Sequence, residues 1–190
     1  MSKLYVNEIA PKSGNEVTVT GLVNTPSSGS IIQVQYDQLT TGTYQQHSAN
    51  TYTKLTSFPS VTITPTSTSS KLMIDVMWNG EFDVVGNTWS SVFVLYRDNT
   101  LLKGNTDTGY NYSGMFIPTT SYTSSDDDST AEQMIGKYFD TPSTTSAVTY
   151  YLGLKATTAG HIFINRVVNG STANGYERMI SNMTITEIAG

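Results

Sequence analysis

The chain has 190 residues, a formal net charge of −5 at pH 7, 13% charged residues and no cysteine. Without cysteine it forms neither disulfides nor thiolate metal sites. Its negative charge and the lack of a basic stripe argue against nucleic acid as a partner. Its polar positions carry 30 threonines and 22 serines instead. Because threonine packs well on a pleated strand, and the usual residues of helix surfaces are scarce, the composition predicts an all-β protein.

The first 20 residues predict a small β-hairpin with turn residues at its centre. A hairpin of this size is not stable alone in water, so it must pack on the main domain, on a sister chain or on another protein. We therefore expect residues 1–20 to form an N-terminal arm, residues 21–30 a linker of turn-forming residues, and residues 31–190 one head domain. The apolar side chains predicted to attach the arm are Leu4, Val6, Ile9, Val17 and Val19.

Apolar runs in this sequence are short. None reaches the length of a signal-peptide core or of a membrane span. We therefore expect a chain that is made in a cytoplasm and does not insert into a membrane.

From residue 30 onward, short segments of alternating polarity follow one another. In residues 71–82, Leu72, Ile74, Val76 and Trp78 share one face of a strand. Residues 133–139 suit either a strand or one helical turn. About eight strands without a long helix indicate a sandwich, a jelly roll or a barrel. Strands are predicted at 31–36, 61–65, 71–82, 91–97, 100–102, 148–154, 161–168 and 179–188, with 133–139 as a further candidate.

One polar segment, residues 104–132, is longer than the other connections. It is expected to be a surface loop, or a loop with a short hairpin. It contains Asp126, Asp127 and Asp128, but consecutive carboxylates lack the ligand spacing of a calcium loop. A solvated loop is the favoured interpretation, and no metal site is predicted.

Four segments carry a resemblance to a known class of proteins. In residues 61–74 a strand ends in proline, and a Ser/Thr turn and a Ser-Lys pair open the next apolar strand. Residues 96–100 form an Arg-Asp-Asn-Thr hairpin, residues 183–188 a closing strand, and residues 4–15 an opening strand followed by Ser-Gly-Asn. Taken together in their order along the chain, these segments resemble tail-fibre-like and other virion appendage proteins of marine and cyanobacterial phages. The resemblance implies a trimeric antiparallel jelly-roll head, similar to the tumour-necrosis-factor-like class, carried on the virion by the N-terminal hairpin arm.

A homotrimer is also expected from the residues themselves. Residues 91–97, 148–154 and 161–168 are apolar at both inward and outward strand positions. A lone sandwich exposes one face of each sheet, which should then be polar. Closed self-association is the simplest way to bury a second apolar face.

Catalysis is not predicted. His47 and His161 are the two histidines, and no nucleophile-elbow motif accompanies them. Glu81 and Asp83 lie two residues apart on one strand face, a spacing that arises readily by chance and is weak evidence for glycoside cleavage. We expect a protein without enzymatic activity and without a cofactor.

Aromatic side chains in expected loops are the best candidates for contacts. Tyrosine and tryptophan faces suit stacked sugar rings, such as those of a host surface glycan, and suit protein interfaces equally well. They also suit the ends of a sandwich core, which is the third alternative. The candidates are Tyr44, Tyr52, Trp89, Tyr110, Tyr112 and Tyr122.

Two functions remain open at this point. The first is a trimeric tail fibre or spike, whose arm binds a tail adaptor and whose head contacts the host. The second is a capsid decoration protein that stabilises the shell. A secreted carbohydrate-binding module would share the fold, but it would require a signal peptide.

Overall fold

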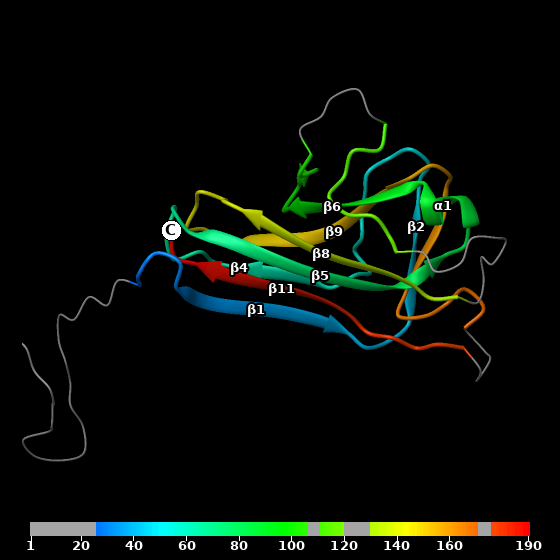
Figure 1. Ribbon diagram of the computed structural model, residues 1–190, viewed down its shortest axis with the longest axis horizontal. Helices are drawn as coiled ribbons and strands as arrows, with labels where there is room; N and C mark the ends of the chain where they lie inside the picture. The colour runs from blue at the N-terminus through cyan, green and yellow to red at the C-terminus, as the bar shows by residue number, and fades with distance from the viewer. Residues whose placement is uncertain (1–25, 106–110, 120–129, 171–175) are drawn as a thin grey trace, which may run out of the picture.

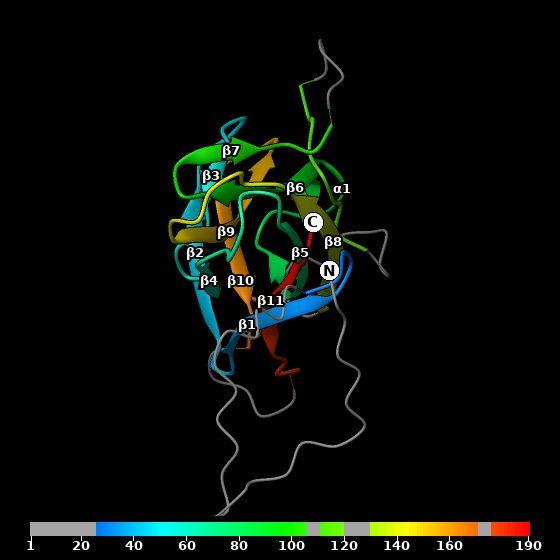
Figure 2. The same cartoon turned by 90° about the vertical axis from the view of Figure 1, so that its left-hand side faces the viewer.

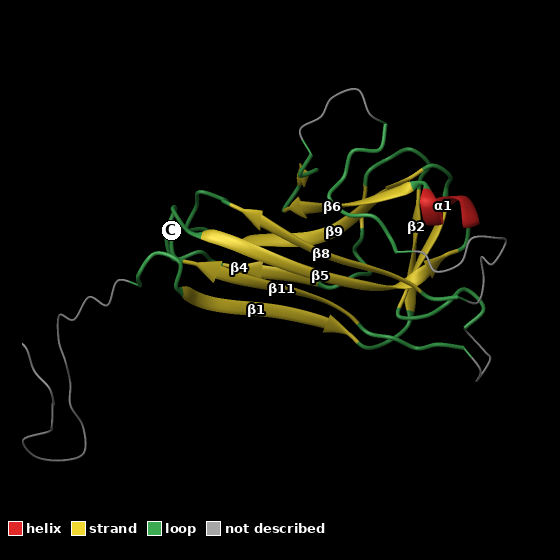
Figure 3. Cartoon of the chain, in the orientation of Figure 1, coloured by secondary structure: helices red, strands yellow, loops and turns green. Residues whose placement is uncertain are grey.

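The computed structural model describes residues 26–105, 111–119, 130–170 and 176–190. In these residues eleven strands form two antiparallel sheets packed face to face, and there is one short helix. Figure 1 shows them from the side and Figure 3 colours them by element type. The elements are β1 (Ile31–Leu39), β2 (Thr43–His47), β3 (Thr53–Lys54), β4 (Ser60–Ile63), β5 (Lys71–Phe82), α1 (Val85–Trp89), β6 (Ser91–Arg97), β7 (Thr100–Leu102), β8 (Glu132–Asp140), β9 (Val148–Ala156), β10 (Gly160–Ile164) and β11 (Ser181–Ile188).

The order of the strands defines the fold. In the first sheet β1, β11, β5 and β8 lie side by side, and β10 and β2 extend this sheet where β10 pairs with the end of β5. In the second sheet β3 and β4 pair with β9, which is followed by β6 and β7. Numbered along the chain without β2, β3 and β10, the strands read 1-8-3-6 in the first sheet and 2-7-4-5 in the second. This is the strand order of a jelly roll, so the predicted fold class is confirmed.

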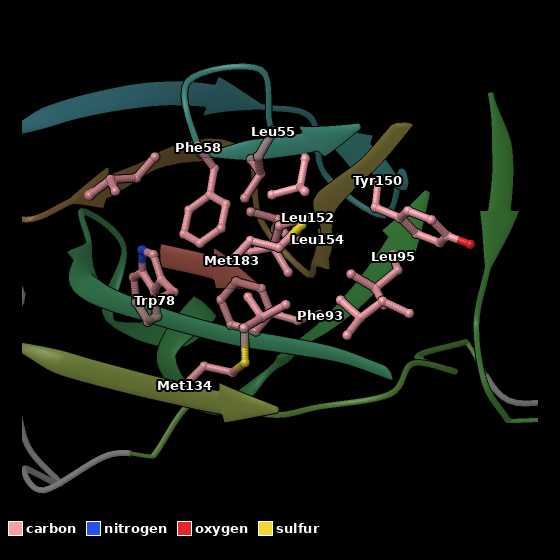
Figure 4. Close-up of a cluster of buried hydrophobic side chains, with 14 of the residues drawn as sticks. Leu55, Phe58, Trp78, Phe93, Leu95, Met134, Tyr150, Leu152, Leu154 and Met183 are labelled. Carbon is pink, nitrogen blue, oxygen red and sulfur yellow. The ribbon is translucent and has the colours of Figure 1, made fainter. Parts of the chain in front are cut away.

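The core lies between the two sheets. As predicted, the alternation of β5 turns Leu72, Ile74, Val76 and Trp78 inward, and all four are buried. The Trp78 indole Nε1–H donates to the main-chain oxygen of Phe163 at 3.0 Å, so its one polar group is satisfied. Figure 4 shows the side chains of both sheets interleaved; those it labels are Leu55, Phe58, Trp78, Phe93, Leu95, Met134, Tyr150, Leu152, Leu154 and Met183.

Both ends of the head domain lie at one end of the sandwich. The main-chain nitrogen of Gly29 donates to the oxygen of Ala189, and the nitrogen of Ala189 donates to Ser30. The C-terminus therefore lies beside the start of β1, as Figures 1 and 2 show, whereas α1 lies at the opposite end in Figure 1. Anything attached before residue 26 enters the head at the end far from α1.

Several sequence expectations have direct outcomes here. Strands 71–82 and 91–97 have the predicted bounds, and residues 132–140 form a strand rather than a helical turn. The strands β2 and β3 and the helix α1 were not predicted, and the strand predicted at 161–168 ends at Ile164. The predicted arm, with Leu4, Val6, Ile9, Val17 and Val19, lies outside the described residues, as do Asp126, Asp127 and Asp128.

Candidate interaction surfaces

The first surface points away from the core across β1, β11, β5 and β8. Strand register aligns its side chains in three rows: from Val34 to Phe139, from Tyr36 to Lys137, and along Met77 to Ile135. We call this surface the outer face. It comprises Val34, Tyr36, Gln38, Met73, Asp75, Met77, Ile135, Lys137, Phe139, Asn182, Thr184 and Thr186.

The outer face carries several large apolar side chains that are open to solvent. Tyr36 is 75% exposed, Ile135 68% and Phe139 54%. Asp75 and Lys137 form an ion pair, because Lys137 Nζ lies 3.0 Å from a carboxylate oxygen of Asp75, and the exposed Lys71 lies on the same side of β5. The sequence alternation within 133–139 contained the signal for Ile135 and Phe139, but they were not among the predicted contact residues.

The opposite surface, on the second sheet, is covered by the chain itself. Val92 and Val94 point outward on β6 yet are buried. Tyr52 lies over this sheet, where its hydroxyl donates to the oxygen of Ser113 at 2.6 Å and its own main-chain oxygen accepts from the Tyr96 hydroxyl at 3.1 Å. The outward apolar residues of 91–97, on which the sequence argument for a trimer partly rested, are therefore buried within one chain, and the trimer stays a prediction.

Lysines lie over the tyrosines of this second surface. The Lys155 ammonium lies 5.1 Å from the ring centre of Tyr52 and 5.2 Å from that of Tyr112. Burial raises the pKa of Tyr52. The structure thus brings two of the predicted contact residues together, and both are partly buried with their polar groups in use.

A pocket of about 200 Å³ adjoins α1, which ends at Trp89. Its lining residues are Thr88, Trp89, Ser91, Ile117 and Pro118. The Trp89 side chain is 57% exposed and Ile117 is 71% exposed, so the rim is apolar. We call it the Trp89 pocket.

The inner wall of the Trp89 pocket is polar. The Thr88 hydroxyl donates to Glu132 Oε1 at 2.6 Å, which places the Glu132 carboxyl directly behind this wall. Ser91 Oγ and Glu132 Oε2 are buried and have no hydrogen-bond partner among the described residues. Burial raises the pKa of Glu132 to about 7. The hydrogen bond from Thr88 lowers this pKa, and the nearby Glu81 carboxylate raises it further.

Tyr44 belongs to a separate cluster on β2 and β10. Its ring stacks on Phe163 at 5.5 Å between ring centres and meets the edge of His161 at 5.4 Å. Tyr44 is 55% exposed. The remaining candidates, Tyr110 and Tyr122, lie outside the described residues.

The residues weighed for catalysis serve other contacts. His161 Nδ1 lies 2.6 Å from a carboxylate oxygen of Asp83, and the Glu81 carboxylate accepts from the main-chain nitrogens of Thr130 and Val168. His47 is buried, and burial lowers its pKa. In the part of the chain that the structure describes, no three His, Asp or Glu residues gather into a group that could hold a metal ion.

No protein-family model matches the chain, and no curated protein matches it either. No helix in the described ranges is long and apolar enough to span a membrane.

Proposed function

We propose that this chain is a structural protein of a bacteriophage particle, a trimeric tail-fibre or spike-type appendage that acts by assembly and surface contact. The arm of residues 1–20 anchors it to the virion, and the jelly-roll head contacts the host. The proposal is supported by the resemblance of the sequence to phage appendage proteins and by the jelly-roll strand order.

The observation that carries the proposal is the outer face. Four strands about 4.8 Å apart and roughly seven residues long at ~3.4 Å each give a flat area of about 450 Å². Its exposed apolar side chains share this area with Asp75, Lys137 and two threonines, and the largest apolar patch on a protein surface is often a functional site. Its occupant in this proposal is the same face of two further copies of the chain.

Charge favours copies of the chain as the occupant. The chain carries a net charge of −5, so two copies repel each other over most of their surface. On the outer face Asp75 pairs with Lys137, and the exposed Lys71 at the end of β5 adds no negative charge. In a closed threefold ring one side of each outer face would meet the other side of the next copy's outer face, and closure around the axis prevents open-ended growth.

The positions of the chain ends suit an appendage. Residue 26 enters the head beside the C-terminus, and α1 lies at the other end (Figure 1). An arm bound to the particle would therefore leave the α1 end pointing outward, toward a host surface.

Cryo-electron microscopy of the phage particle that encodes the chain tests this function. We expect threefold density of the jelly-roll head at the tail or its collar, with the C-terminal end toward the particle. Density repeated over the icosahedral shell would replace the appendage by a capsid decoration protein. Particles that lack the chain altogether would overturn both.

A further inference from the structure

We propose that the Trp89 pocket binds one neutral sugar ring of a bacterial surface glycan. The inference deepens the proposed function and rests on it for the source of the ligand, a host surface. The binding chemistry itself is carried by the pocket residues alone.

The rim supplies the stacking surface that a sugar needs. Trp89 is exposed at the end of α1, and Ile117 and Pro118 form the facing apolar wall. The C–H face of a pyranose ring packs on an indole, while its hydroxyls stay free to hydrogen-bond. A pocket of about 200 Å³ suits one ring rather than a longer chain.

The inner wall supplies the hydrogen-bonding group. Ser91 is 5% exposed, lines the pocket, and carries a hydroxyl without a partner among the described residues. The Ser91 Oγ is closed to solvent in the unbound chain, so the proposal includes a small movement of the pocket wall that lets a sugar hydroxyl satisfy it as donor or acceptor. Glu132, hydrogen-bonded through Thr88, places a carboxyl group behind the wall and disfavours an anionic ligand.

The position of the Trp89 pocket in the fold agrees with the binding of a host surface glycan. α1 lies at the end of the sandwich opposite the C-terminus and the entry of residue 26 (Figure 1). A glycan site there faces away from the anchoring end of the proposed appendage.

The test uses the full chain and the methyl glycosides of glucose, galactose, mannose, rhamnose and N-acetylglucosamine. Binding is followed by saturation-transfer NMR and by tryptophan fluorescence. The second tryptophan, Trp78, is fully buried, so a ligand that changes the fluorescence of a solvent-exposed tryptophan reports on Trp89. We expect at least one glycoside to bind in the millimolar range, and Trp89→Ala to weaken it by roughly tenfold.

Ser91→Ala separates binding from folding. Removing an unpartnered buried hydroxyl should leave the Tm unchanged or higher, while the affinity for the glycoside falls by roughly fivefold. Tyr44→Ala, an exposed aromatic outside the pocket, is the matched control and should bind like the wild type. A merely structural Ser91 would give the reverse, a lower Tm and unchanged affinity.

Two results would overturn the inference: no glycoside changes either signal at millimolar concentration, or Trp89→Ala binds as tightly as the wild type. Sedimentation of the same sample reports its mass. A trimer that binds no sugar refutes the pocket alone, and a monomer that binds sugar refutes the proposed assembly alone.

Discussion

Two buried carboxyl groups, Glu187 and Glu132, respond to pH in different ranges. Burial raises the pKa of Glu187, but hydrogen bonds from Ser70, Gln33 and Thr66 outweigh it, so its pKa lies below the ordinary value. Its contribution to stability is therefore present above pH 4.5 and is lost as the pH falls through the lowered pKa.

Glu187→Gln should lower the free energy of unfolding by roughly 2–3 kcal/mol at neutral pH, because an amide cannot accept all of these hydrogen bonds. Urea denaturation measures this, with the exposed Glu177→Gln as the control. Equal stabilities of the two variants would show that the hydrogen bonds to Glu187 contribute nothing.

Glu132 has the opposite sign. Its folded-state pKa of about 7 exceeds the unfolded value of 4.5, so the folded state holds the proton more tightly. Its contribution is complete below pH 4.5 and declines as the pH rises to 7. Glu132→Gln should therefore stabilise the protein at pH 8 by roughly 2–3 kcal/mol and little at pH 4.5. Urea denaturation of the wild type and of Glu132→Gln at pH 4.5 and pH 8 measures this difference. An equal change in stability at both pH values would contradict the raised pKa of Glu132.

Among the elements, β5 and β10 approach unusually closely at Gly80. A Cβ on Gly80 would lie 1.9 Å from the main-chain oxygen of Phe163, the acceptor of the Trp78 indole N–H. Gly80→Ala must therefore push β10 away from β5 and should cost roughly 3 kcal/mol or more. Gly86→Ala in α1 is the control, since nothing lies within 4 Å of its Cβ. Thermal unfolding that ranks the two variants equally would refute this account of the β5–β10 contact.

The sequence predicted elements where the local pattern was strong. β5 and β6 combine alternating or continuous apolar residues with turns at both ends, and their bounds were correct. β2 is mostly polar, and it is held by pairing with β10 more than a hundred residues later. Such long-range pairing leaves no local signal, so β2 was missed.

The candidate surfaces show the same division. Trp89 stood out as an aromatic residue in an expected loop, but Ser91 gave no signal, because its burial in the pocket wall depends on the placement of Ile117 and Pro118. Outward positions were readable from alternation in β5, whereas β6 is apolar at inward and outward positions alike. Which sheet is covered depends on Tyr52 and on residues 111–116, and that choice is set only by the folded chain.

At the scale of the whole molecule, the outer face joins the fold to the proposed function. Ile135→Asp places a charge on β8, at the edge of this face, without touching the core, because Ile135 is 68% exposed. The variant should fold with an unchanged Tm for the monomer but fail to associate, since burying three unpaired carboxylates is costly. Ile117→Asp, an equally exposed isoleucine in the Trp89 pocket, should associate like the wild type.

Sedimentation equilibrium of the full chain tests this central claim most directly. The account predicts a mass of about 62 kDa, three times the 20.7 kDa of one chain, and a return to a single-chain mass in Ile135→Asp. A wild-type protein that sediments as a monomer at micromolar concentration, or an Ile135→Asp variant that still forms trimers, would contradict the claim that this face is the assembly surface.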